Sequence, residues 1–288
     1  MNNPVFILGT QRSGSTLLTR ALSSHPKIYI QNEMPLERLF QPDATTESIS
    51  KNLKAHISKK TGLTVDTLAD KFDIWGIKDP QLTEHIDSLV PFIKTNKFII
   101  LVRDARAVTS SYMDNKWGLG TNAYTGATRW KDEIQKQLEL MKQYPKNFLL
   151  IKYEDLVENM EVELRKVCSH LDVEFSDAML DYYQGSANFV ANAANINTQK
   201  KPNASNAIKW QSSLTSRQIK IIEEVTRRLL ELFNYKIQTD GLKLNRLEVL
   251  YYSLHQLVIG EFQIQWQLYK AKRRWEKNNS SIGISSKK

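Results

Sequence analysis

The chain contains one cysteine, Cys168, among 288 residues, so an intrachain disulfide is impossible. We therefore expect a reducing, cytoplasmic compartment, in which Cys168 is simply a small buried apolar residue. The uninterrupted apolar runs are all shorter than the roughly 18 residues that a membrane-spanning helix needs. The first strand-like run begins at Val5, which leaves no room before it for a signal peptide. The sequence thus predicts neither a membrane span nor a secretion leader.

Histidine is also scarce. The five histidines are scattered without the spacing of a ligand set, so no metal site is expected. Positive charge is in excess, at a net +9, but it is unevenly placed. Residues 241–288 hold nine Lys and Arg against three Glu, a net +6, which leaves only +3 for the first 240 residues. Because most of the basic charge belongs to the tail, a nucleic-acid-binding protein is not expected.

Short apolar runs alternate with helical patterns through the first half of the chain. Strands are predicted at Val5–Gly9, Ile28–Ile30, Ile74–Lys78, Phe98–Val102 and Phe148–Lys152. Helices are predicted at 15–24, 34–40, 46–60, 81–92, 105–116 and 123–144. This alternation is typical of α/β proteins, and we predict a P-loop-type, three-layer fold with a central parallel sheet flanked by helices. Residues 1–240 are assigned to this domain and 241–288 to a C-terminal helical extension.

The second half of the chain is mostly helical, apart from an Asn-rich loop at 188–206. A helix at 215–233 carries an apolar stripe, formed by Ile219, Ile222, Val225, Leu229 and Leu232. In the tail, apolar residues recur every three or four positions from Leu247 to Tyr269, and a basic run, Lys270–Arg274, and a flexible end from Asn278 follow. The tail stripe has open interpretations: packing on the protein's own core, contact with a second copy, or peripheral contact with a membrane.

The most informative segment is Gly9-Thr10-Gln11-Arg12-Ser13-Gly14-Ser15-Thr16, which lies between the first strand and the first helix. Its glycines allow a tight turn, and a helix start directs backbone N–H groups toward an anion. The segment therefore predicts a phosphate-binding loop. A nucleoside-triphosphate P-loop has Lys where this chain has Ser15. We therefore expect a nucleotide with less charge at its reactive end.

A second polar segment, Arg103 to Tyr112, directly follows the strand at 98–102. Because ligands of such sheets bind beyond the carboxyl ends of the strands, Arg103 and Ser111 are candidates for holding a second phosphate. Asp104 would favour the helix dipole and brace an Arg. The alternative is an ordinary helix start with a surface charge pair.

Taken in order, these motifs resemble those of the sulfotransferases that use 3′-phosphoadenosine 5′-phosphosulfate (PAPS) as donor. Residues 9–18 resemble the 5′-phosphosulfate loop of that family, and Val102–Ala107 with Ser111 resembles its 3′-phosphate site. His25-Pro26 and the segment 152–156 match it too, and the resemblance spans about residues 4–235. It implies that the donor is held by Arg12, Ser13, Gly14, Ser15, Thr16, Arg103, Ser111 and Tyr153.

Within that family, the chain is most similar to the branch that contains tyrosylprotein sulfotransferases and many bacterial sulfotransferases. There, a Glu seven residues beyond a His-Pro pair activates the acceptor, and Glu33 stands at that distance from Pro26. Lys78-Asp79-Pro80 matches a tripeptide of the branch, and Lys209-Trp210 matches a late pair that closes over the nucleotide. The resemblance implies that Glu33 is the general base, which we expect to be buried, and that Lys78 and Arg12 stabilise the leaving group without a metal.

The chain also departs from that branch. Asn115 and Lys116 occupy a region where an Arg is common, and Pro35 stands where the tyrosylprotein enzymes have an Arg. Specificity for peptide tyrosine is therefore not implied. The expected partner is a hydroxyl-bearing acceptor, which leaves carbohydrate, lipid, natural product and peptide open.

Two other classes of function compete with this interpretation. A P-loop kinase or nucleotide hydrolase would use the same loop, and a membrane or protein docking module would use the basic tail. Single residues have structural alternatives as well: Glu33 as a helix-start carboxylate, Lys78 as a solvated charge, and Tyr153 and Trp210 as core aromatics. His25 is expected to be a structural cap or packing residue rather than a catalyst. If Glu33 is not the base, His25 and Glu37 are the next candidates.

Overall fold

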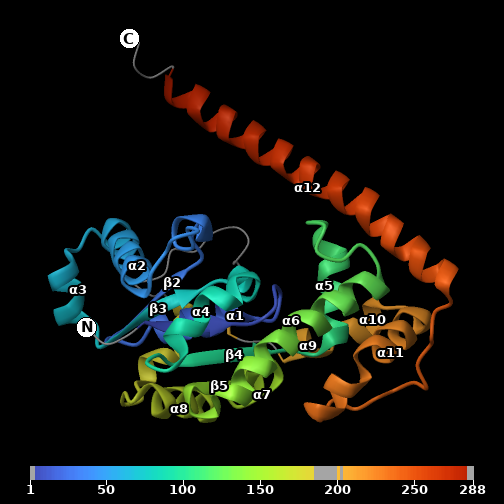
Figure 1. Cartoon of the computed structure of the whole chain (residues 1–288), viewed down its shortest axis with the longest axis horizontal. Helices are drawn as coiled ribbons and strands as arrows, with labels where there is room; N and C mark the ends of the chain where they lie inside the picture. The colour runs from blue at the N-terminus through green and yellow to red at the C-terminus, as the bar shows by residue number, and fades with distance from the viewer. Residues whose placement is uncertain (1–3, 185–199, 202–203, 284–288) are drawn as a thin grey trace. The chain divides into compact units, whose positions relative to one another are not determined.

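Five parallel strands form one sheet in the computed structural model of the chain, which describes residues 4–184, 200–201 and 204–283, with backbone alone for 277–283. The strands are β1 (Val5–Leu8), β2 (Ile28–Asn32), β3 (Ile74–Lys78), β4 (Phe98–Val102) and β5 (Phe148–Lys152). Their order across the sheet is β2-β3-β1-β4-β5. All four pairings are parallel, which confirms the predicted α/β class with its parallel sheet (Figure 1). Since β1 lies between β3 and β4, the loop that follows it lies at the point where the order of strands reverses direction across the sheet.

Helices cover both faces of the sheet. On one face, Ile7, Leu101 and Ile151 form a buried cluster with residues of α1 (Ser15–Ser23) and α8 (Met160–Leu171). On the other face, Phe6, Phe98 and Phe148 stack across adjacent strands, with ring centroids 5.1 and 4.8 Å apart. Phe92 of α4 (Ile86–Ile93) packs edge-on against Phe6. The strands are hydrophobic throughout because both of their faces are covered.

The chain forms two compact units, which are described separately. The first comprises Met1–Arg103 and Asp132–Ile208, and the second Asp104–Lys131 and Lys209–Lys288. The predicted boundary near residue 240 therefore stays a prediction. The remaining α-helices are α2 (Thr46–Thr61), α3 (Val65–Lys71), α5 (Ala105–Asn115), α6 (Ala123–Gln143), α7 (Tyr153–Glu158), α9 (Ser205–Ile208), α10 (Trp210–Ser213), α11 (Ser216–Leu232) and α12 (Arg246–Gly283). No helix in the described part of the chain has the length and apolarity needed to cross a membrane.

Some predicted helices differ from the structure. The helix expected at 34–40 is a short 3₁₀ turn, Leu36–Arg38, and that expected at 81–92 divides into a 3₁₀ segment, Pro80–His85, and α4. The flexible end expected from Asn278 is helical as far as Gly283. Most of the Asn-rich loop at 188–206 lies outside the described residues.

Candidate active site

The loop after β1 adopts a backbone that few residues tolerate. Gly9, Arg12 and Gly14 all have positive φ, at 156°, 67° and 94°. At Gly14 a second constraint applies, because an added Cβ would lie 2.3 Å from Cδ2 of Tyr153. Glycine is therefore required at this position both by its backbone angles and by the aromatic ring packed against it.

This loop is lined with polar groups that lack partners within the described structure. The side-chain oxygens of Thr10 and Ser13 are buried without a hydrogen bond. Helix α1 begins directly after the loop at Ser15, and the first N–H groups of a helix have no intrahelical acceptor. Buried hydroxyls are normally hydrogen-bonded, so these two point to a missing acceptor such as a phosphate oxygen. The loop thus fits the anion that its sequence predicts.

Three predicted site residues meet beside this loop. Lys78 stands at the end of β3 with its side chain 1% exposed. Its Nζ donates to Glu33 Oε1 at 2.6 Å and to Thr16 Oγ1 at 3.3 Å. The alternative of a solvated Lys78 is therefore wrong. The carboxylate and the loop hydroxyl lie within two hydrogen-bond lengths of each other, joined by one ammonium group.

Glu33 is held by its backbone, while its side chain is accessible. It has a left-handed φ of 57°, and its N–H donates to Lys78 O at 2.8 Å. The amide of Gln31 donates to Glu33 O at 3.0 Å. The expected burial is wrong, because 55% of the Glu33 side chain is exposed. A strained backbone that is held by several bonds is a common feature of functional sites.

Sequence reasoning missed the supporting roles of Gln31 and Asp79. Asp79 accepts from the N–H of Met34 at 3.4 Å and from that of Gln81 at 2.9 Å, and so fixes the chain after Glu33. Burial is the largest influence on this carboxyl and raises the pKa of Asp79. The signal that could have identified them is their position, because both are polar residues near the carboxyl ends of buried strands.

Arg103 contacts the same loop after β1 from the end of β4. Its Nη1 donates to Arg12 O at 3.1 Å, and its Nη2 donates to Asn206 O at 2.6 Å. Its guanidinium also lies over the ring of Tyr153, 4.4 Å from the centroid. Burial is the main factor that raises the pKa of Tyr153. Arg12 itself is exposed, and its carbonyl is the group that meets Arg103.

The other predicted donor-binding residues belong to the second unit. Ser111 lies on α5, while Lys209 and Trp210 are at the start of α10. Trp210 is buried, and the guanidinium of Arg106 lies 4.2 Å above its ring. The Lys209 side chain is exposed. The nucleotide-binding roles of Ser111, Lys209 and Trp210 stay predictions.

Arg106 is the centre of a buried ionic network in that unit. Its Nη2 lies 2.7 Å from Asp104 Oδ2, and its Nη1 lies 2.6 Å from Glu223 Oε1. Asp104 caps α5 by accepting from the Arg106 N–H at 2.8 Å. The Arg that Asp104 braces directly is therefore Arg106, and the interpretation as a surface charge pair is wrong because this pair is buried.

His25 has the structural role expected of it. Its Nδ1 accepts from the Lys27 N–H at 3.0 Å, and its Nε2 lies 2.8 Å from Glu174 O. These partners fit a ring that accepts at Nδ1 and donates from Nε2. Since backbone groups engage both nitrogens, His25 has no free lone pair for a proton from the attacking hydroxyl. The residues that the structure describes contain no group of three or more His, Cys, Asp or Glu suited to a metal ion, and a metal-free reaction stays a proposal.

Comparison with known proteins gives a consistent assignment. A family profile described as "Sulfotransferase family" matches residues 4–177. A putative protein-tyrosine sulfotransferase of Caenorhabditis briggsae is 25% identical over 200 residues, which cover 62% of this chain and 69% of that protein. Protein-tyrosine sulfotransferase A of Caenorhabditis elegans is 25% identical over 237 residues, 73% of this chain and 61% of that protein. The match to the Drosophila melanogaster protein-tyrosine sulfotransferase spans only 40% of its length.

Solved structures show the same fold. The sulfotransferase domain from the curacin biosynthetic pathway superposes with a TM-score of 0.62 and 22% identity, covering 83% of this chain and 99% of that domain. The sulfotransferase domain of the Synechococcus PCC 7002 olefin synthase gives a TM-score of 0.61, with 23% identity and coverages of 83% and 98%. The family profile spans more than half of the chain, and the chain belongs to the sulfotransferase family.

Proposed function

We propose that this protein transfers a sulfuryl group from PAPS to an acceptor hydroxyl, with Glu33 as the general base. The observation that carries the proposal is the Glu33–Lys78–Thr16 chain of hydrogen bonds. This chain of bonds joins a carboxylate, a cation and a hydroxyl of the loop after β1, which supports a displacement reaction in which they act as base, charge stabiliser and donor ligand. The two buried hydroxyls of the loop without partners, Thr10 and Ser13, support an anionic donor.

Separate groups would hold the two ends of the donor. The 5′-phosphosulfate would be bound by Arg12, Ser13, Gly14, Ser15 and Thr16. The 3′-phosphate would be bound by Arg103 and Ser111, with Tyr153, Lys209 and Trp210 contributing to the nucleotide site. Arg103 contacts the loop carbonyl of Arg12, which supports its role as a cation beside this loop. A planar guanidinium suits a phosphate because it can donate two parallel hydrogen bonds.

The residues divide the chemistry between them. Bound PAPS supplies the sulfuryl group: its bond to the bridging oxygen breaks while a bond to the acceptor oxygen forms, roughly in line as in phosphoryl transfer. Glu33 accepts the proton that the attacking hydroxyl loses. The bridging oxygen would leave with the electron pair as part of the 5′-phosphate, and Lys78 would stabilise the negative charge that grows on it. Its present contact with Glu33 keeps this ammonium oriented within a buried site.

The acceptor is a molecule with a nucleophilic hydroxyl. Two curated relatives are named for protein tyrosine, whereas one similar solved domain comes from the curacin biosynthetic pathway and another from an olefin synthase. This chain has Pro35 beside the base, which cannot supply the cation that the tyrosylprotein branch places there. We therefore propose an acceptor whose binding does not depend on that cation, such as a carbohydrate, a lipid or a natural product.

Substitution of Glu33 by Gln tests the base. We expect transfer to fall by about 10²- to 10⁴-fold, the usual contribution of a general base. Binding of 3′,5′-bisphosphoadenosine should be retained, because Lys78 keeps its contact with Thr16 and loses only its carboxylate partner. Initial rates with labelled PAPS and calorimetry with the bisphosphate measure the two effects.

Glu37→Gln is the matched control, since Glu37 is an exposed carboxylate in the same segment. It should transfer at the wild-type rate. Normal transfer by the Glu33 variant, or an equal loss in both variants, would contradict the assignment.

The kinase alternative is tested in the same preparation. It predicts thermal stabilisation by ATP only with Mg²⁺, whereas our proposal predicts stabilisation by the bisphosphate without metal.

A further inference from the structure

Helix α12 belongs to the second unit and packs its polar face, instead of its apolar face, against the rest of that unit. The Oε1 of Gln256 accepts from the Thr121 N–H at 2.8 Å, and its Nε2 donates to Gly118 O at 2.7 Å. About two helical turns further along α12, Gln263 Oε1 accepts from the Gly118 N–H at 3.1 Å. The hydrogen-bonding side of the helix is thus occupied by the loop between α5 and α6.

The contact is close enough to fix the helix. A Cβ added to Gly118 would lie 2.7 Å from Gly260 O, so the two backbones touch. His255 Nδ1 and Thr121 Oγ1 are 2.9 Å apart, and Asn122 donates to Tyr252 O at 3.0 Å. These bonds determine which face of α12 is covered by the rest of the second unit.

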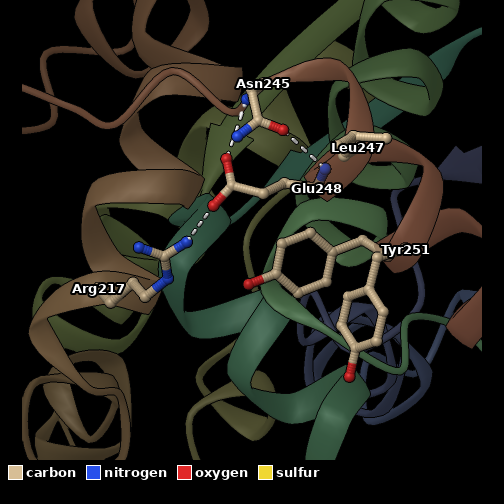
Figure 2. Close-up of a pocket in the computed structure, with 6 residues that line it drawn as sticks. Arg217, Asn245, Leu247, Glu248 and Tyr251 are labelled. Atoms are coloured by element: carbon tan, nitrogen blue, oxygen red, sulfur yellow. Dashed lines mark hydrogen bonds and ion pairs between the residues drawn. The ribbon is translucent and has the colours of Figure 1, made fainter.

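The first turn of α12 is held as well. Asn245 and Glu248 form a reciprocal cap, in which Asn245 N donates to Glu248 Oε2 and Glu248 N donates to Asn245 Oδ1, both at 2.9 Å. Arg217 of α11 binds the other carboxylate oxygen of Glu248 at 2.5 Å. Figure 2 shows Glu248 between Arg217 and Asn245 in an open pocket of about 360 Å³, which Leu247 and Tyr251 also line. The polar walls of this pocket are used to anchor the helix.

The opposite face of α12 is a broad apolar surface, which we call the apolar stripe. Its members are between 47% and 77% exposed: Leu247, Leu250, Tyr251, Leu254, Leu257, Val258, Phe262, Trp266, Leu268 and Tyr269. At 3.6 residues per turn they cover about half of the helix circumference over roughly 33 Å. Within its own unit the stripe therefore does not pack on a core, contrary to one of the expected alternatives. A surface helix normally exposes its polar side, so the reversed arrangement indicates an apolar partner.

Charge at the end of the stripe identifies the chemistry of that partner. Four cations, at Lys270, Lys272, Arg273 and Arg274, and no carboxylate lie between Phe262 and Trp275. Lys270 lies 5.2 Å from the ring centroid of Trp266, and Arg273 lies 5.5 Å from that of Tyr269. Aromatic rings beside cations at the end of an apolar face are typical of helices that lie in the headgroup region of anionic membranes.

The same charges disfavour pairing with a second copy. A parallel pair would place the two basic runs side by side. An antiparallel pair centred on Val258 would place the basic run of one copy beside Lys243 and Arg246 of the other. Both arrangements bring like charges together in an apolar contact, which is costly. The stripe is also wider than the narrow seam that a two-helix coiled coil buries.

We propose that the apolar stripe of α12, with the basic run Lys270–Arg274, docks the protein on the surface of an anionic membrane, with the helix lying in the plane of the interface. The stripe would enter the boundary between headgroups and acyl chains, while the cations meet lipid phosphates. The loop that binds the polar face remains on the water side. This inference rests on α12 alone and is independent of the proposed transfer reaction.

Vesicle flotation of the full chain tests the docking. The expected result is binding to vesicles with equal parts phosphatidylcholine and phosphatidylglycerol, and little binding to phosphatidylcholine alone. Phe262→Ser with Trp266→Ser should remove the binding. Lys272→Glu with Arg273→Glu should lower the partition coefficient by on the order of 100-fold, because each cation near an anionic surface contributes about a fivefold factor and each charge reversal counts more than a removal.

Lys59→Glu with Lys60→Glu is the matched control, since both lysines are exposed on α2, a helix whose apolar residues Ile49, Leu53 and Ile57 are buried. It should bind as the wild type does. Equal losses in the two charge-reversal variants, or no binding by the wild type, would overturn the proposal. So would a dimer in light scattering that needs Phe262 and Trp266 while vesicle binding does not. Circular dichroism of each variant confirms that the helices remain folded.

Discussion

Gly14 and Gly62 have similar left-handed backbones, but only Gly14 has a neighbour in the way. Its φ is 94°, and an added Cβ would meet Tyr153 at 2.3 Å. Gly62 has a φ of 71° at the end of α2, and no atom lies within 4 Å of its added Cβ. Substitutions at Gly62 and Gly14 therefore separate two losses of stability: the loss from backbone strain alone, and the further loss from a clash in the loop after β1.

We predict that Gly62→Ala lowers the free energy of unfolding by about 1–2 kcal/mol, the cost of a left-handed alanine. Gly14→Ala should lose that amount and about 1–3 kcal/mol more, because the Tyr153 ring must move. It should also lose thermal stabilisation by 3′,5′-bisphosphoadenosine, which Gly62→Ala retains. Urea unfolding and thermal shifts measure both effects. Similar losses in the two variants would mean that Tyr153 does not constrain the loop.

Tyr153 also shows why two interpretations of a residue need not compete. The sequence left it either as a core aromatic or as part of a nucleotide site. In the structure it is 7% exposed, belongs to the buried cluster below α1, and contacts both Gly14 and Arg103. A packing residue that touches the loop and its cation shapes the site through its packing.

Arg106 joins helices α5 and α11 in a way that sequence patterns do not reveal. The stripe predicted for α11 included Leu232, which is 61% exposed, while Glu223 is fully buried. Glu223 accepts from Arg106 and also from the N–H groups of Gln238 and Thr239, at 3.0 and 2.8 Å. Ile222 and Leu229 are buried as predicted. A periodicity count treats Glu as a surface residue, so it misses Glu223 and shifts the predicted stripe by part of a turn.

Arg106→Met should therefore be strongly destabilising. It leaves two buried carboxylates, Asp104 and Glu223, without their cation, and removing one partner of a buried ion pair costs about 3–5 kcal/mol. Lys27→Met, which breaks an exposed pair with Asp73, should cost at most about 1 kcal/mol. Urea unfolding of both variants provides the comparison. A loss for Arg106→Met as small as that for Lys27→Met would show that the network contributes little to stability.

The strands were the most predictable elements. Each one is a short apolar run ended by a polar or glycine residue, and the largest error is at β2, which continues two residues past Ile30 to Asn32. Helix α3 was missed because seven residues are too few to show a period. The predicted helix at 81–92 begins as a 3₁₀ segment after Pro80, whose lack of an N–H removes one backbone donor at this start.

For the molecule as a whole, the site was predictable where residues near in space also follow neighbouring strands. Glu33 directly follows β2, and Lys78 is the last residue of β3. Both lie near the loop after β1, because β2, β3 and β1 are neighbours in the sheet. Side-chain orientation was not predictable, because it depends on φ at Glu33 and on bonds from Gln31 and Asp79. The apolar stripe of α12 was found as a period, but only the structure shows which of its faces is covered.

Two partly buried histidines should make the stability of the molecule depend on pH. Burial, with Lys97 as the next cause, lowers the pKa of His170 from its usual 6.5. Burial and the charges of Lys60, Arg38 and Lys59 likewise lower the pKa of His56. The unfolded chain therefore binds more protons than the folded chain just below pH 6.5. The free energy of unfolding therefore falls as the pH drops below 6.5, and it stops falling once the histidines of the folded chain are protonated too.

Unfolding in urea between about pH 8 and about pH 5 should thus show a falling midpoint toward acid. His170→Gln keeps a side-chain donor for Phe98 O, which lies 3.2 Å from His170 Nε2, but it does not titrate. The variant should lose less stability than the wild type over the same interval. Asp79 acts in the opposite sense, because its raised pKa makes the folded chain bind the extra proton. Comparing variant with wild type cancels this contribution, and an identical pH profile for the two proteins would show that His170 does not couple protonation to folding.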